Sequence, residues 1–119
     1  MMINMTLNEI INMQKQFDSN HESTFLWNTQ ITDNNLENLE FLLVAFAGEF
    51  GEVSNIVKKI VRGDFSLDEK RNEISEEIAD MFAYLIKMAY QLDIDLELAY
   101  LEKIRKNKEK FKHYEKNNC

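Results

Sequence analysis

Apolar residues recur with the helical period along nearly the whole chain. No proline and only three glycines interrupt this pattern. It predicts an all-α single domain with helices over about residues 7–18, 35–62, 67–92 and 96–113. A polar segment without periodicity, residues 18–33, lies between the first two helices, and loops of this length are often functional.

Polar residues mark the expected helix boundaries. Three pairs have the spacing of N-terminal caps: Thr6 with Glu9, Asn34 with Glu37, and Ser66 with Glu69. Gly63 follows the second helix and suits the C′ position. Because only residues 63–66 separate the second and third helices, these two are expected to form an antiparallel hairpin.

Composition narrows the class of protein. The 119 residues suffice for one domain. Hydrophobic residues make up 45% of the chain, but no apolar stretch is long enough to cross a bilayer. A formal net charge of −7 disfavours binding to a polynucleotide. An acidic protein can still bind a small phosphate compound through a bridging metal. The single cysteine, Cys119, excludes an intrachain disulfide. No secretory-type sequence opens the chain, so we expect a cytoplasmic protein that does not contact a membrane.

Two acidic residues interrupt the apolar stripe of the second expected helix. At about 100° per residue, Glu49 falls inside the stripe, close to the directions of Leu42 and Ile60. Glu52 falls about 60° to one side. An ionised, unpaired carboxylate at such a position is costly, so it must be protonated, paired with a cation or bound to a metal.

The third expected helix carries a second acidic pair. Its apolar stripe is expected to face the core and comprises Ile74, Ile78, Met81, Phe82, Leu85 and Ala89. Glu77 lies at the edge of this stripe and Asp80 lies about 60° further round. In the hairpin, Glu49 and Glu52 stand roughly 15 to 20 Å from the turn, as do Glu77 and Asp80. All four carboxylates are therefore expected to converge.

A hard divalent cation is the simplest neutraliser for four converging carboxylates. Mg²⁺ prefers oxygen ligands, whereas zinc or iron would be expected to bring His or Cys. Neither His21 nor His113 has the Glu-x-x-His spacing of a di-iron bundle. The sequence therefore favours Mg²⁺.

The alternative is that these acids lie on ordinary solvated helix faces. They would then pair with Lys58, Lys70 or Arg71. This interpretation suits Glu73 and Glu76 better than Glu49, because Glu49 lies within the apolar stripe.

Three segments, LLVAFAGEFGEV, EEIADMFAYLIKMA and KIRKNKEKF, resemble MazG-type all-α nucleoside triphosphate pyrophosphohydrolases. The first two contain Glu49-x-x-Glu52 and Glu77-x-x-Asp80, and the similarity covers about residues 36–111. The resemblance implies a four-to-five-helix bundle built around an antiparallel helix hairpin and assembled as a homodimer or homotetramer. It also implies hydrolysis of a nucleoside triphosphate to the monophosphate and pyrophosphate, for cleansing the nucleotide pool. The cofactor would be Mg²⁺, with Mn²⁺ as a substitute.

The resemblance also implies roles for single residues. Glu49, Glu52, Glu77 and Asp80 would bind Mg²⁺, and one of these acids, Glu49 or Glu52 among them, or the neighbouring Glu76 would activate the attacking water. Lys103, Asn107 and Lys110 would contact phosphate and Tyr84 the nucleoside, while Trp27 in the long loop could stack on a base or anchor the loop. A basic helix end also complements the helix dipole, and aromatic residues on helices are more often core.

Two other functions fit the same sequence. One is a helical interaction or regulatory module that has kept the bundle and does no chemistry. The other is a metal-dependent phosphohydrolase that attacks the γ-phosphorus and releases orthophosphate. An interaction module should not be stabilised by Mg²⁺, whereas the enzyme should be. The product distinguishes the two enzymes, since a pyrophosphohydrolase releases pyrophosphate and the other phosphohydrolase releases orthophosphate.

Overall fold

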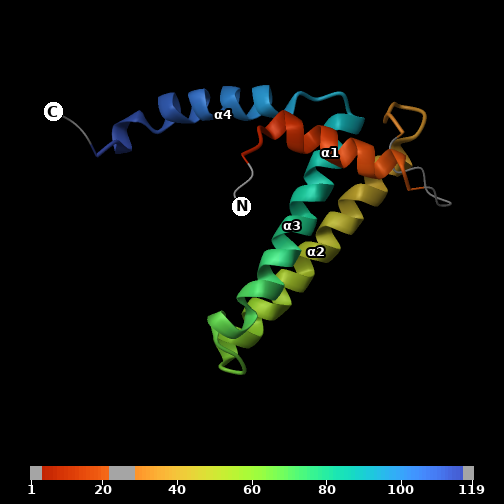
Figure 1. The fold of residues 1–119 in the computed structure, drawn as a ribbon. Helices are drawn as coiled ribbons and strands as arrows, with labels where there is room; N and C mark the ends of the chain where they lie inside the picture. The colour runs from red at the N-terminus through yellow and green to blue at the C-terminus, as the bar shows by residue number, and fades with distance from the viewer. Residues whose placement is uncertain (1–3, 22–28, 117–119) are drawn as a thin grey trace.

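The computed structural model describes residues 4–21 and 29–116, and this part of the chain is helical without strands (Figure 1). The elements are α1 (Leu7–Ser19), α2 (Leu36–Arg62), α3 (Leu67–Gln91), α4 (Leu96–Lys110) and a short 3₁₀ helix, η1 (Lys112–Tyr114). The all-α fold class expected from the sequence is confirmed.

Two of the expected caps form as predicted. The Thr6 side chain accepts a hydrogen bond from the backbone N–H of Glu9 at 3.1 Å. At α3 the Ser66 side chain accepts from the N–H of Glu69 at 3.1 Å, and the Glu69 carboxylate accepts from the N–H of Ser66 at 3.4 Å. These bonds satisfy amides that have no partner inside the helix, so they fix where each helix begins.

The cap predicted at Asn34 is wrong, because the N-cap residue of α2 is Asn35 and its side chain makes no cap hydrogen bond. The Asn35 side chain binds the preceding segment instead. Its oxygen accepts from the N–H of Thr32 at 2.6 Å, and its nitrogen donates to the carbonyl of Gln30 at 2.9 Å. A local turn therefore competes successfully with the cap for the same amide group.

Helices α2 and α3 form the expected antiparallel hairpin and lie side by side along their length (Figure 1). Gly63 ends α2 with a left-handed φ of 95°, a conformation that costs glycine little. Its N–H donates to the carbonyl of Ile60 at 3.0 Å, and the N–H of Asp64 donates to that of Lys59 at 2.9 Å. This C-terminal motif turns the chain directly into the capping box of α3.

The remaining helices lie at the end of the hairpin that is far from this turn (Figure 1). There α1 crosses α3, while α4 leads away from the hairpin. The small core lies at the same end. Its buried apolar residues within the described chain are Ile11, Ile31, Leu42, Ile86 and Ala89.

A buried polar network fastens α1 to α3. The Asp18 carboxylate, 2% exposed, lies 3.4 Å from the ammonium nitrogen of Lys87. It also accepts hydrogen bonds from the Tyr90 hydroxyl and, at 3.0 Å, from the side-chain amide of Gln14. Burial first, and then the bond to Asp18, raise the pKa of Tyr90, so its hydroxyl remains a donor. The charge of Asp18 is thus compensated by groups from two helices.

Much of the apolar surface is uncovered in the single chain. Ile78, Phe82 and Leu85 were expected in the core, but 53%, 42% and 44% of their surfaces are exposed. The expectation is wrong for the single chain: among the described elements, α1 and α4 lie at the far end of the hairpin, and these three side chains remain exposed. Despite this apolar surface, no helix in the described ranges combines the length and hydropathy needed to cross a membrane.

The Asp18 network leads to a prediction about stability. Replacing Asp18 by Asn removes the counter-charge and leaves the Lys87 ammonium buried, which should lower the free energy of unfolding by about 3 to 5 kcal/mol. Urea unfolding followed by circular dichroism measures this change. The control is Asp33→Asn at an exposed position, and equal stabilities of the two variants would contradict the prediction.

Candidate functional site

Three carboxylates meet across the α2–α3 hairpin. Glu49 and Glu52 lie one turn apart on α2, and Glu77 faces them from α3; one carboxylate oxygen of each lies within 4.8 Å of the other two. Glu49 and Glu77 are half-buried, whereas Glu52 is exposed. The convergence of these three side chains, predicted from their equal distance to the turn, is observed.

Two further acids of α3, Glu76 and Asp80, lie close to Glu77 in the sequence. Asp80 lines a cavity together with Glu49, and its charge is one of the causes that raise the pKa of Glu52 and of Glu77. It therefore borders the group of three without belonging to it, so the predicted convergence of four carboxylates is observed for three of them. Glu76 is exposed and does not belong to that group.

Interactions among the carboxylates themselves determine the electrostatics of the cluster. The pKa of Glu77 is raised, first by a hydrogen bond shared with Glu49 and also by burial and by the charges of Glu49 and Asp80. The pKa of Glu52 is raised first by its hydrogen bond with Glu77 and then by the charge of Glu77. The raised pKa values of Glu52 and Glu77 reflect the cost of holding neighbouring carboxylates in the charged form together.

The donor set fits a hard divalent cation. One oxygen each of Glu49 and Glu77 is buried and has no hydrogen-bond partner among the described residues. Such atoms are costly unless a ligand satisfies them. The ligands available are carboxylate oxygens, which suit Mg²⁺ and not a metal that requires sulfur or imidazole.

Nearby cations that could have neutralised the cluster bind other acids. Lys70 pairs with Glu73 at 3.0 Å, and Arg71 pairs with Asp68 at 2.8 Å. Both pairs lie within α3, between residues three apart. The solvated pairing expected for Glu73 is therefore observed, but neither Lys70 nor Arg71 makes such an ion pair with Glu49.

A cavity of about 470 Å³ opens beside the carboxylates. Its lining residues are Gln14, Phe17, Glu49, Asp80, Ala83, Tyr84 and Lys87. Burial raises the pKa of Tyr84, and the charges of Glu49 and Asp80 raise it further, so this side chain stands close to the acids. The position of Tyr84 is compatible with the predicted contact to a nucleoside.

The sequence did not indicate Lys87 or the contribution of α1 to this cavity. Lys87 is 9% exposed, and its ammonium lies 5.2 Å from the centre of the Tyr84 ring. Gln14 and Phe17 come from α1, across the cavity mouth from α3. No local sequence signal marks these positions, because they become neighbours of the acids only when α1 docks on α3.

The substrate contacts predicted on α4 do not line the cavity beside the carboxylates within one chain. Lys103, Asn107 and Lys110 lie on α4, which leads away from the hairpin, and none of them lines the cavity that contains Glu49 (Figure 1). Trp27 lies outside the described residues. These roles remain predictions.

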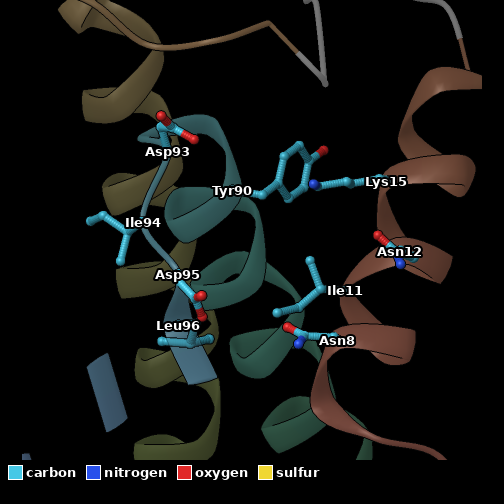
Figure 2. A pocket seen from close by; sticks show the side chains of 9 residues that line it. All are labelled: Asn8, Ile11, Asn12, Lys15, Tyr90, Asp93, Ile94, Asp95 and Leu96. Carbon is cyan, nitrogen blue, oxygen red and sulfur yellow. The ribbon is translucent and has the colours of Figure 1, made fainter. Parts of the chain in front are cut away.

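A second cavity, of about 460 Å³, lies between α1 and the connection from α3 to α4 (Figure 2). Figure 2 shows Tyr90 extending from α3 toward Lys15 of α1, whose ammonium lies 5.5 Å from the ring centre. The acids on this wall are Asp93 and Asp95, and Asp95 caps α4. Because the converging carboxylates lie elsewhere, the cavity of Figure 2 is not the candidate site.

Comparison with known proteins agrees with this geometry. A family model described as "MazG nucleotide pyrophosphohydrolase domain" matches residues 37–117, which include both acidic pairs. The chain belongs to this MazG family. The resemblance seen in the sequence is thereby confirmed, and the MazG match begins after α1.

A relative of this MazG chain is the "Gene 37 protein" of Mycobacterium phage L5, which is 33% identical over 63 residues. The match covers 51% of this chain and 55% of the phage protein, so the chain spans about half the length of the curated relative that it matches. No solved structure gives a significant match.

The carboxylate cluster leads to a prediction about metal-free protein. Without a metal, Glu77→Gln should raise the melting temperature by a few degrees near neutral pH, because it removes like-charge repulsion. The folded-state pKa of Glu77 lies above 4.5, so the stabilisation contributed by its protonated form is present at acid pH and is lost as the pH rises through the raised pKa.

Thermal unfolding of wild type and Glu77→Gln, with EDTA or with Mg²⁺, tests this prediction. Mg²⁺ should stabilise the wild type and have little effect on Glu77→Gln, since a ligand of the native state raises apparent stability. Glu73→Gln, one turn away on α3, is the matched control and should respond like the wild type. Equal Mg²⁺ responses in Glu77→Gln and wild type would contradict the assignment of the cluster as a metal site.

Proposed function

We propose that this MazG-family chain is a Mg²⁺-dependent nucleoside triphosphate pyrophosphohydrolase. It would convert a ribo- or deoxyribonucleoside triphosphate to the monophosphate and pyrophosphate and so cleanse the nucleotide pool. The observation that carries the proposal is the group formed by Glu49, Glu52 and Glu77, with two buried oxygens that have no hydrogen-bond partner among the described residues. The family match supports the reaction class.

The residues of the hairpin would hold the metal. Glu49, Glu52 and Glu77 supply oxygens from two helices, and Asp80 stands at the border of the group as a further ligand. When bound, Mg²⁺, or Mn²⁺ in its place, neutralises charge on the phosphate oxygens and makes water a better nucleophile. The packing of α2 against α3 holds these carboxylates in position before substrate arrives, which lowers the reorganisation needed for reaction.

A carboxylate would act as the general base that accepts a proton from the attacking water. A general base must lie within hydrogen-bond reach of the water that attacks the α-phosphorus. Glu52 is exposed and its pKa is raised by Glu77, so it is placed to accept a proton at the rim of the group. Glu49 and Glu76 are the other acids proposed for this role.

The remaining substrate contacts would come from Tyr84 and from α4. Tyr84 borders the cavity next to Glu49 and Asp80 and would contact the nucleoside. Lys103, Asn107 and Lys110 would contact phosphate, with Trp27 against the base. Because α4 leads away from its own hairpin, its basic residues would act on the acidic hairpin of a second copy (Figure 1).

Exposed apolar residues support this homo-oligomer, as a dimer or tetramer. On the hairpin, Val44 and Phe50 are 66% and 59% exposed, and on α4, Leu98 and Leu101 are 56% and 58% exposed. Large apolar side chains exposed on both elements are consistent with an interaction site. A symmetric assembly would cover it and bring α4 to a neighbouring hairpin.

The proposed reaction is tested by incubating the protein with a panel of nucleoside triphosphates and Mg²⁺ and by measuring pyrophosphate and orthophosphate separately. Wild type should release pyrophosphate and a monophosphate, and EDTA should stop the reaction. Glu49→Gln should lower turnover by about a hundredfold or more, because it weakens preorganised charge stabilisation.

The control for hydrolysis is Glu73→Gln, which keeps the hairpin and all four proposed ligands. Orthophosphate as the first product would assign a different phosphohydrolase. Mg²⁺-dependent turnover that survives Glu49→Gln unchanged would rule out the proposed site. No product from any triphosphate would favour a MazG-like interaction module without catalysis.

Light scattering coupled to size exclusion tests the proposed assembly. Wild type should have a mass that is two or four times that of the 14.1 kDa chain. Replacing Leu98 and Leu101 by Asp should shift the population toward monomer, because charged groups resist burial in an apolar interface. Glu109→Gln on α4 is the control, and a monomeric wild type would contradict the assembly.

A further inference from the structure

Lys87 is a cation buried on the wall of an acidic cavity. Its surface is 9% exposed, and it lines the same cavity as Glu49 and Asp80. Among the described residues that line this cavity, it is the one lysine or arginine. The cavity therefore has negative charge on one side and positive charge on the other, with the Tyr84 ring next to both.

A triphosphate bound through a metal has this same division of charge. One divalent cation offsets part of the negative charge of the phosphate chain, and the remaining oxygens need further donors. A lysine ammonium carries three N–H donors, so its pairing with Asp18 is compatible with a contact to a ligand oxygen. The carboxylates would hold the metal at one end while the ammonium meets an oxygen at the other.

Burial of the Asp18–Lys87 pair is difficult to explain by stability alone. Two apolar residues of similar volume usually serve as well as a buried ion pair or better. Asp18 nevertheless has three partners from α1 and α3: Gln14, Lys87 and Tyr90. This network fixes the direction of Lys87 next to the cavity.

We propose that Lys87 contacts the phosphate chain of the bound nucleotide, and that Asp18 is a positioning residue that holds the Lys87 ammonium at the cavity. The inference rests on the proposed triphosphate site. It adds to that site Lys87 of α3, which is held by Asp18 of α1. Asp18 lies before residue 37, where the family match begins, so the arrangement belongs to this chain and does not follow from the match.

The test uses inorganic triphosphate as the probe, because it contains the phosphate chain without base or sugar. Its dissociation constant is measured by calorimetry with Mg²⁺, alongside KM and kcat for the best nucleoside triphosphate. Lys87→Met alone would leave Asp18 buried without its counter-charge and so destabilise the fold. The informative variant is therefore Asp18→Asn combined with Lys87→Met, which removes both charges together.

The double variant should bind inorganic triphosphate about tenfold more weakly or worse and raise KM by a similar factor, as loss of a charged hydrogen bond implies. Lys87→Arg keeps the charge and should stay closer to wild type. Lys15→Met is the matched control, because Lys15 lies over the Tyr90 ring but lines the other cavity, and it should leave binding and KM unchanged.

Each outcome separates this inference from the proposed function. A folded double variant that hydrolyses and binds like wild type overturns the role of Lys87 and leaves the pyrophosphohydrolase intact. Lys87-dependent binding of inorganic triphosphate without hydrolysis by wild type supports the phosphate contact and overturns the proposed reaction. A wild type that binds no inorganic triphosphate in the presence of Mg²⁺ overturns the role of Lys87.

Discussion

The short turn between α2 and α3 is the constraint on which the candidate site depends. Glu52 lies ten residues before the end of α2, and Glu77 lies ten residues after the start of α3. A one-residue insertion in either interval would rotate the side chain by about 100° and move it about 1.5 Å along the helix. The left-handed Gly63 and the Ser66–Glu69 capping box therefore fix the alignment of the acids as well as the helix ends.

The alignment of the acids lowers the stability of the metal-free chain. Three carboxylates with oxygens within 4.8 Å repel one another, and two buried oxygens have no partner in the described structure. Leu42 of α2 and Ile86 of α3 are 0% and 1% exposed, and their burial further along the hairpin, away from the turn, helps to hold the two helices together against this repulsion. Groups that violate the usual rules of burial, held in place by a well-packed scaffold, are typical of functional sites.

The sequence predicted what local rules determine. Helix periods, the Thr6 and Ser66 caps and the short turn sufficed for the hairpin, and counting residues along it sufficed to bring Glu49, Glu52 and Glu77 together. It failed at Asn35, where two local hydrogen-bonding patterns compete for one side chain. It also failed for the α3 stripe, because periodicity shows which residues share a face and not whether another helix covers that face.

Lys87 shows a different limit of sequence reasoning. Its partner Asp18 is distant in the chain, and Lys87 lies inside the segment EEIADMFAYLIKMA but outside the Glu77-x-x-Asp80 motif of that segment. Their contact exists only because α1 docks on α3, an event that helical periodicity does not specify. The placement of Lys103, Asn107 and Lys110 has the same limitation, since their spacing defines a common face of α4 but not the surface that this face meets.

The chain thus divides into a part that the MazG match covers and a part that precedes it. The MazG match covers the hairpin and α4, where every proposed metal ligand lies, whereas α1 precedes it. Through Gln14, Phe17 and Asp18, α1 shapes the cavity wall and positions Lys87 without contributing to the carboxylate group. If the hairpin carries the bond-breaking chemistry, differences between members in how they hold the rest of the substrate should be concentrated in elements such as α1, which can change without disturbing the register of the acids.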